Sequence, residues 1–191
     1  MPVPLNRVLV VAATEHELAA SGGWRTLCCG VGPVEAAATT AAAIARDRPA
    51  AIVHVGIAGT RRDQALSPAT LVIGTETRYH DLAVPAHLAP AVLATAPALI
   101  EAVARAFPDA PRLAIGTSGR IGGTSDTIVE AMEGFGVLRA AQIAGVPAIE
   151  VRVISNEIEE TDRARWHFAA AFAAVLAATP ALVEEVARCV S

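Results

Sequence analysis

The chain has 191 residues, a net charge of −4, 53% hydrophobic residues and only 4% aromatic residues. This length fits one domain over residues 1–191, with a single core built mainly from small aliphatic side chains. Because the arginines are scattered and the net charge is negative, the sequence lacks the basic stripe of nucleic-acid-binding proteins, and that class of partner is excluded.

Short apolar runs alternate with alanine-rich segments along the chain, which is the pattern of an α/β protein. The apolar runs are nearly continuous, so we expect a sheet that helices cover on both faces. The predicted strands are Arg7–Ala13, Arg25–Cys29, Ala51–Gly56, Thr70–Thr75, Arg112–Ser118 and Ala148–Ser155. The predicted helices are Val34–Asp47, Pro97–Phe107, Phe135–Ala144 and Arg163–Ala178.

The first predicted strand is followed at once by acidic residues. Its apolar run, Val8–Ala13, is too short for the hydrophobic segment of a signal peptide, so we expect no secretion. Glu15 and Glu17 come next, and acids at a strand end are costly unless they meet water or perform chemistry. Thr14 and Glu17 also have the spacing of a capping box, so a structural role at a helix start is the alternative.

The second predicted strand ends at two of the three cysteines, Cys28 and Cys29. An odd number of cysteines without partners at metal-ligand spacing favours a reduced, cytoplasmic setting, with both side chains buried or half-buried. The next loop, Cys29–Glu35, has two glycines and a proline, and a dinucleotide-binding turn would look similar. That fingerprint requires a third glycine where Glu35 stands, so we interpret the loop as a tight strand-to-helix connection.

Two stretches in the middle of the chain have mixed composition. Val55–Thr60, VGIAGT, predicts a glycine-rich turn whose backbone is open to a flat ligand, with a purely structural turn as the alternative. Thr75–Val84, TETRYHDLAV, contains Arg78, His80 and Asp81, which we expect in a solvated loop, and we leave His80 outside the catalytic set. Leu82–Pro97 contains several prolines and is the least regular segment, so it is the expected mobile loop.

The last third of the chain carries three polar or aromatic candidates. Met132 and Glu133 precede a predicted helix, and a carboxylate there could accept strong hydrogen bonds. The strand Ala148–Ser155 stops at Asn156, which brings a polar side chain to a strand end, where open α/β sheets bind ligands. Trp166 follows ten residues later, with core packing as its alternative role.

The carboxyl-terminal segment is the most membrane-like part of the chain. Phe168–Val183 falls short of the ~20 apolar residues that a spanning helix needs, so we expect a buried helix and no membrane partner. Pro180 lacks a backbone donor and clashes with the preceding turn of a helix, which predicts a kink or a break near Ala178.

Two of these segments together resemble a known family. Glu150–Phe172 and the AMEG of Ala131–Gly134 resemble the end of the nucleoside phosphorylase and nucleosidase superfamily, and more closely the futalosine hydrolases within it. VGIAGT and TETRYHDLAV resemble further nucleosidase segments, so the similarity runs from about Val8 to Phe172. The resemblance implies a nucleoside phosphorylase-like fold, a three-layer α/β sandwich with a central mixed sheet.

The resemblance also implies catalytic and ribose-binding residues. Glu17 aligns with the glutamate that activates water in nucleosidases. Met132 and Glu133 correspond to the ribose clasp, in which the methionine packs on the sugar and the carboxylate accepts from its hydroxyls. The phosphorylases have a Gly-Asp-Pro pattern with a phosphate-binding arginine near the first strand, and its absence here favours hydrolysis.

The base and the 5′ substituent are assigned in the same way. Asn156 stands where adenine-specific nucleosidases have Asp, and an amide donor can pair with a 6-oxo group or N7, which favours a hypoxanthine-like base. Ala58 and Gly59 correspond to the backbone that lines the base, although Ile57 stands where the family often has Ser. Trp166 matches a position that packs on the 5′ substituent, and its large ring would suit an aromatic one.

The implied reaction is cleavage of the N-ribosidic bond of futalosine to hypoxanthine and dehypoxanthine futalosine, a step of menaquinone biosynthesis. It would be performed by a cytoplasmic homo-oligomer, a dimer or larger, without a metal or organic cofactor. Another purine nucleosidase or a phosphorylase on the same scaffold is one alternative. A non-catalytic purine-binding module is another, because the loop Gly119–Asp126 is short and lacks the Phe that stacks on purine in relatives.

Overall fold

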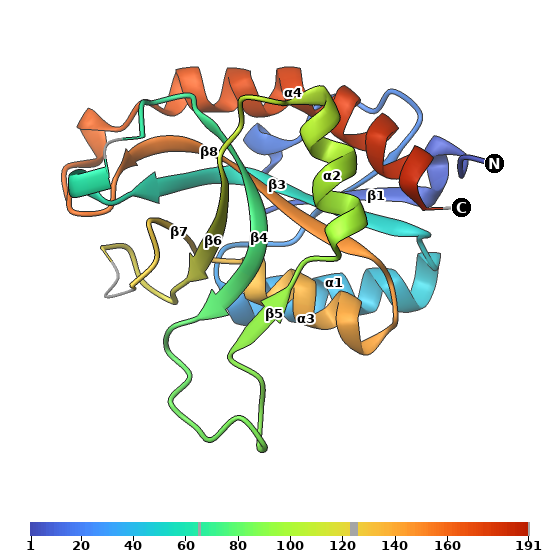
Figure 1. Ribbon diagram of the computed structural model, residues 1–191, viewed down its shortest axis with the longest axis horizontal. Coiled ribbons are helices and arrows are strands. Elements are labelled where there is room, and N and C mark those ends of the chain that lie inside the picture. The colour runs from blue at the N-terminus through green and yellow to red at the C-terminus, as the bar shows by residue number, and fades with distance from the viewer. Residues whose placement is uncertain (65, 123–125, 191) are drawn as a thin grey trace.

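A central mixed sheet lies between two pairs of helices in the computed structural model, which describes residues 1–64, 66–122 and 126–190 (Figure 1). Helices α2 (Pro97–Ala106) and α4 (Phe168–Cys189) cover one face, and α1 (Pro33–Asp47) and α3 (Gly134–Ile143) cover the other. The predicted three-layer α/β sandwich with a mixed sheet is confirmed.

The sheet has eight strands within the described residues. They are β1 (Val8–Ala12), β2 (Arg25–Cys28), β3 (Ala51–Thr60), β4 (Leu71–Tyr79), β5 (Val92–Ala94), β6 (Arg112–Thr117), β7 (Val129–Ala131) and β8 (Ala148–Glu157). The six predicted strands are all present, whereas β5 and β7 were not predicted. Both have only three residues, which is too short for a period-two pattern to emerge. Single 3₁₀ turns cover Leu5–Arg7, Glu15–Glu17, Arg62–Gln64 and Arg163–Arg165.

Five of the strands pair in a closed ring. β3 pairs with β8, β8 with β4, β4 with β6, β6 with β7, and β7 returns to β3. Each contributes to one small apolar cluster, made of Ala58, Val72, Ile115, Val129, Ala131 and Ile154. β1 and β2 extend the sheet beyond the ring in parallel.

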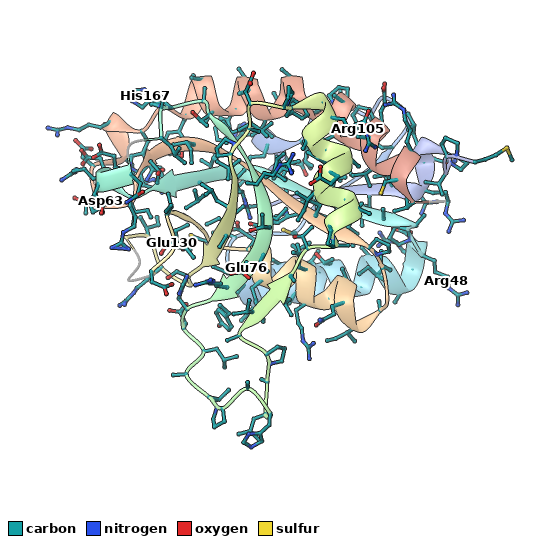
Figure 2. All side chains as sticks on the ribbon, in the orientation of Figure 1. Arg48, Asp63, Glu76, Arg105, Glu130 and His167 are labelled. Carbon is teal, nitrogen blue, oxygen red and sulfur yellow. The ribbon has the colours of Figure 1, made fainter. Side chains whose placement is uncertain are left out.

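The strands are buried on both faces, as the continuous apolar runs predicted. In β1, Val8 and Val10 belong to the core under α2 and α4, while Leu9 and Val11 belong to the core under α1 and α3. This alternation follows from the period of two in a strand. Charged side chains such as Arg48 and Asp63 lie at the outer edge of the molecule (Figure 2).

The predicted turn at Val55–Thr60 is wrong, because β3 continues to Thr60 with a pairing irregularity between Ala58 and Gly59. Its glycines serve close packing within the strand. A Cβ on Gly56 would overlap the guanidinium of Arg152 and stand 2.9 Å from a carboxylate oxygen of Glu17. The connection Cys29–Glu35 is the predicted tight turn, with Gly30 and Gly32 in the left-handed region.

The carboxyl-terminal helix differs from its prediction. Residues 163–165 form a separate 3₁₀ turn, and α4 begins at Phe168 and runs unbroken through Pro180 to Cys189. Of the predicted kink or break, the break is therefore wrong, whereas α4 does bend in its second half (Figure 1). Among the described residues, α4 is the one helix long and apolar enough to cross a membrane. Its side chains at Val175, Leu182 and Val186 pack in the core, so we interpret it as a core helix.

Two further expectations about single residues need correction. Cys29 is buried as expected, but Cys28 at the end of β2 is exposed. Arg78 was expected in a solvated loop, whereas it lies in β4, where its guanidinium donates to Glu76 at 2.6 Å. The loop between β4 and β5 extends away from the body of the molecule (Figure 1), and β5 interrupts the segment expected to be irregular.

Candidate active site

A cavity of about 260 Å³ lies at the carboxyl ends of β1, β3 and β8. The loop before α1, the turn before α3 and the first turns of α4 also border this cavity. All seven residues selected from the sequence line this cavity: Glu17, Ala58, Gly59, Met132, Glu133, Asn156 and Trp166. The structure thus brings together residues up to 149 positions apart in the sequence, while their roles stay predictions.

The carboxylate of Glu17 is held by three donors. One oxygen accepts from the backbone N–H and the hydroxyl of Thr14, both at 2.9 Å, and the other accepts from the backbone N–H of Ile57 at 3.0 Å. The predicted capping box is present. Glu17 is only 4% exposed, yet it lines the cavity. The capping bonds therefore fix the position of a carboxylate that can still meet a ligand.

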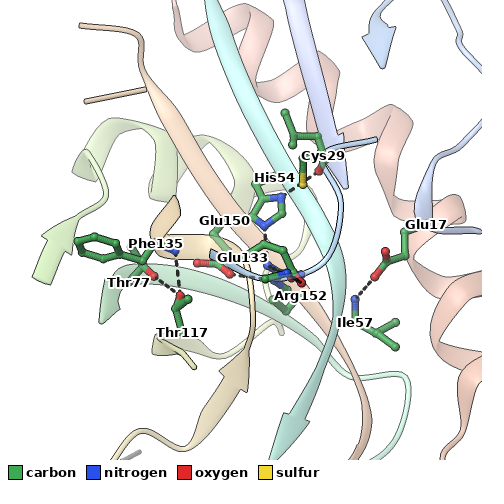
Figure 3. A network of polar contacts seen from close by, with 12 residues as sticks. Glu17, Cys29, His54, Ile57, Thr77, Thr117, Glu133, Phe135, Glu150 and Arg152 are labelled. Atoms are coloured by element: carbon green, nitrogen blue, oxygen red, sulfur yellow. Dashed lines mark hydrogen bonds and ion pairs between the residues drawn. The ribbon is translucent and has the colours of Figure 1, made fainter. Parts of the chain in front are cut away.

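Glu133 lies beside a buried arginine, Arg152, that was not predicted from the sequence as a site residue. One carboxylate oxygen of Glu133 accepts from the backbone N–H of Gly32 at 3.2 Å, and the other lies 3.4 Å from Nη2 of Arg152. Arg152 is 0% exposed, and its Nε donates to Glu150 at 2.8 Å (Figure 3). One fully buried guanidinium thus contacts the carboxylates of both Glu133 and Glu150. The backbone N–H of Gly32, in the loop before α1, also holds the carboxylate of Glu133.

His54 completes this network on β3. Its Nδ1 lies 3.0 Å from the carbonyl oxygen of Val11, and its Nε2 faces Nη2 of Arg152. Burial and the charge of Arg152 lower the pKa of His54 well below its ordinary value, so the ring is neutral near pH 7. A neutral ring with its proton on Nδ1 donates to Val11 and accepts from Arg152, which satisfies both nitrogens.

The acids around Arg152 affect one another. Burial raises the pKa of Glu150, and the charge of Glu133 raises it further, while Arg152 opposes both effects. Burial, together with the charge of Glu133, raises the pKa of Cys29 to about 12, so that thiol stays protonated. The buried region around Arg152 therefore contains more carboxyl groups than positively charged groups.

Asn156 has a fixed orientation. The hydroxyl of Ser155 donates to its Oδ1 at 2.7 Å, and its Nδ2 donates to the carbonyl oxygen of Glu157 at 2.8 Å. In the sheet, Gly59 pairs with Asn156 on one side and with Glu130 on the other. An amide nitrogen carries two hydrogens, so Nδ2 can also donate to a ligand in the cavity.

Aromatic rings form one wall of the cavity. Trp166 is half-buried, and its indole N–H donates to the carbonyl oxygen of Glu160 at 3.0 Å. Its ring contacts Phe168 with centroids 5.3 Å apart, and Phe168 stacks on Phe172 at 5.8 Å. Phe168 and Phe172 also line the cavity and were not selected from the sequence.

His80 and Asp81 are not among the residues that line the cavity. Nε2 of His80 lies 3.3 Å from the hydroxyl of Thr127, and Asp81 accepts from the backbone N–H of Gly119 at 2.5 Å. In the loop Gly119–Asp126, residues 123–125 lie outside the described residues. Within the described ranges, no group of three His, Cys, Asp or Glu side chains is arranged to hold a metal ion.

The amino-acid sequence matches the model of the phosphorylase superfamily over residues 18–124, more than half of the chain. It is also 34% identical to the futalosine hydrolase of Streptomyces coelicolor, in an alignment that covers 91% of this chain and 83% of that protein. The chain belongs to the phosphorylase superfamily.

Solved structures of the superfamily share the fold. The native futalosine hydrolase of Helicobacter pylori matches with a TM-score of 0.78 and 17% identity, over 94% of this chain and 96% of that one. A 5′-methylthioadenosine/S-adenosylhomocysteine nucleosidase from Neisseria meningitidis, in complex with methylthio-immucillin-A, matches with a TM-score of 0.74 and 25% identity. That match covers 93% of this chain and 98% of the nucleosidase.

Proposed function

We propose that this protein hydrolyses the N-ribosidic bond of a purine nucleoside, with futalosine as the substrate and hypoxanthine as the released base. The observation that carries the proposal is the convergence of Glu17, Glu133 and Asn156 on one cavity from three distant parts of the chain. The relatives named futalosine hydrolase support the choice of substrate.

Each of the three side chains suits one part of the reaction. Glu17, held by Thr14 and Ile57, takes a proton from the attacking water as general base. Glu133, with Met132 beside the sugar, accepts hydrogen bonds from the ribose hydroxyls. As the bond to the base breaks, the ribosyl group becomes positively charged, and the carboxylates of Glu17 and Glu133 stabilise that charge. Asn156 donates to the departing base as negative charge develops there.

The charges of the cavity favour water over phosphate as the second substrate. Three carboxylates line the cavity, from Glu17, Glu130 and Glu133. Arg163 is the one arginine among the described residues of the lining, and the buried Arg152 beside the cavity is already engaged by two carboxylates. A phosphate dianion would therefore meet net negative charge, whereas a neutral water would not.

The activity is tested by incubating the pure protein with futalosine and with methylthioadenosine and following free hypoxanthine and free adenine. We expect hypoxanthine from futalosine at a rate independent of phosphate. Release of adenine alone would make the protein a methylthioadenosine-type nucleosidase. A requirement for phosphate, with ribose-1-phosphate as product, would make it a phosphorylase, and tight binding without turnover would make it a purine-binding module.

Asn156 is expected to decide between hypoxanthine and adenine. An Asp at this position would face the carbonyl oxygen of Glu157, which Nδ2 now contacts, so it would retain a proton and offer both a donor and an acceptor to a 6-amino purine. We expect Asn156→Asp to shift the ratio of kcat/KM toward the adenine nucleoside by about tenfold or more. Asn6→Asp, the same change at an exposed position remote from the cavity, is the control. An unchanged ratio in Asn156→Asp contradicts the role of the amide.

We further propose that the enzyme is a cytoplasmic homo-oligomer, a dimer or larger, that needs no metal or organic cofactor. Large apolar side chains at the surface, among them Val34, Leu88 and Ile143, support an association between copies. The exposed Cys28, which lacks a disulfide partner, supports a reducing environment. The catalytic roles above use only carboxylate and amide side chains.

A further inference from the structure

Three side chains contact the buried guanidinium of Arg152, and the contacts differ in length (Figure 3). Nε of Arg152 donates to Glu150 at 2.8 Å, and Nη2 lies 2.5 Å from Nε2 of His54. The same Nη2 lies 3.4 Å from Oε2 of Glu133, whereas hydrogen bonds between an arginine and a carboxylate usually measure about 2.7–2.9 Å. Arg152 is therefore bound closely by His54 and Glu150 and only loosely by Glu133.

The three partners also differ in their access to a ligand. Glu133 lines the cavity, whereas His54 and Glu150 are not among the residues that line it. His54 is 0% exposed and Glu150 is 1% exposed. Of the three side chains that contact Arg152, Glu133 is thus the one that a nucleoside in the cavity can reach.

His54 and Glu150 are both fixed in place as acceptors. The ring of His54 donates from Nδ1 to the carbonyl oxygen of Val11 at 3.0 Å, which leaves Nε2 as an acceptor. The carboxylate of Glu150 lies against Gly134, the first residue of α3, where an added Cβ would overlap both of its oxygens. The positive end of a helix stabilises a carboxylate in such a place. Both acceptors are therefore held against Arg152 from outside the cavity.

The distance between Arg152 and Glu133 decides how well Glu133 can accept hydrogen bonds from a ligand. An ionised carboxylate offers about four lone-pair sites, and a close pair with a guanidinium would occupy some of them. A loose contact leaves these sites open, while the nearby positive charge still favours the ionised form of Glu133.

We propose that His54 and Glu150 are positioning residues of the ribose site, which keep Arg152 away from Glu133 so that its carboxylate stays free to accept from the ribose hydroxyls. This inference rests on the proposed function and adds to it two residues that do not touch the substrate. Its consequence is specific: loss of either positioning residue should weaken the recognition of hydroxyl groups on the sugar, and not only the fold.

The test uses two substitutions of His54. His54→Leu removes the acceptor for Nη2 of Arg152, whereas His54→Gln can present an amide oxygen at a similar distance along the side chain. Both variants lose the histidine's bond to Val11, so a difference between them reports on the acceptor. The measurement is kcat/KM for futalosine divided by kcat/KM for its 2′-deoxy and its 3′-deoxy analogue. In His54→Leu at least one of these ratios should fall about tenfold or more, because Arg152 closes on Glu133, and in His54→Gln both should stay within about threefold.

Glu150→Gln is the second variant, and it decides the test alone if His54→Leu does not fold. The amide oxygen can still accept from Nε of Arg152, but the negative charge is lost, so the guanidinium is drawn toward Glu133. The same ratio should fall. Glu185→Gln is the matched control, because Glu185 is also a buried glutamate paired with arginines, in α4, and does not line the cavity. Its ratios should equal those of the wild type.

Equal losses for futalosine and for both deoxy analogues in His54→Leu and in Glu150→Gln would overturn the inference, because the two residues would then only stabilise the fold. A ratio that falls as far in His54→Gln as in His54→Leu would also overturn it. Failure of the proposed function is recognised separately, since the wild type would then release no hypoxanthine from futalosine. In that case calorimetry with inosine and its two deoxy analogues decides: a preference for inosine that falls in His54→Leu but not in His54→Gln supports the inference, and an unchanged preference or no binding contradicts it.

Discussion

Glu17→Gln should abolish most of the turnover while the protein still folds and binds the nucleoside. An amide has nearly the shape of the carboxylate but cannot take a proton from water, and loss of a general base costs about 10²–10⁴-fold in rate. The amide can keep the two bonds from Thr14 through its oxygen, although its NH₂ group would then face the backbone N–H of Ile57. The measurement is kcat from the release of free base, with binding followed by calorimetry.

Glu15→Gln is the matched control for that variant. Glu15 lies in the same 3₁₀ turn, but it is exposed and does not line the cavity, so its change of charge should leave kcat within about twofold. A Glu17→Gln protein that folds and turns over within tenfold of the wild type would rule out Glu17 as the general base.

Arg152→Met is expected to have the largest effect on stability. The substitution leaves Glu133 and Glu150 buried without their shared cation, and breaking a buried ion pair in this way costs about 3–5 kcal/mol. Methionine is also apolar, so Nε2 of His54 loses its donor. The free energy of unfolding, from urea denaturation, measures the effect.

The control for Arg152→Met removes an arginine from an exposed pair. Arg112 donates to Glu101 at 2.6 Å at the surface, and Arg112→Met should cost less than about 1 kcal/mol. Adding Glu150→Gln to Arg152→Met should restore part of the lost stability, since one uncompensated charge is then removed. Equal losses for the two arginine variants would mean that the buried network contributes no more than a surface pair.

The polar residues that follow buried runs could be found in the sequence. Glu17 stands five positions after β1, and Asn156 is the last residue but one of β8, so their place at the carboxyl edge of the sheet followed from the strand pattern. The capping box at Thr14 was readable from residue types and spacing alone. The family resemblance then connected these positions to one cavity.

Arg152 was missed because it lies inside a strand rather than at its end. The only local signal was the alternation of Glu150 and Arg152 in an otherwise apolar run, which puts both on one face of β8. Its other partners, His54 and Glu133, are distant in the sequence, so only the folded structure shows why a buried arginine is tolerated.

The extension of β3 through Val55–Thr60 could not be predicted for a related reason. Two glycines with a small and a polar neighbour, Ala58 and Thr60, are typical of a turn, and the local pattern alone favours that interpretation. Instead, position 56 needs glycine because Arg152 and Glu17 occupy the space that a side chain would fill there. Position 59 needs glycine because Asn156 and Ile158 do the same. These demands come from elements that lie far along the chain.

The ring of five strands also bears on how the protein is made on the ribosome. β3 occupies residues 51–60, yet it pairs along its length with β8, which is translated almost a hundred residues later. Such distant pairing makes folding slow, because a long loop must close before any contact forms. A nascent chain whose β8 has not yet left the ribosome therefore has Glu17 and Glu133, but it lacks Asn156 and the closed ring of strands. Catalytic competence should arise in a single late step of synthesis, not gradually.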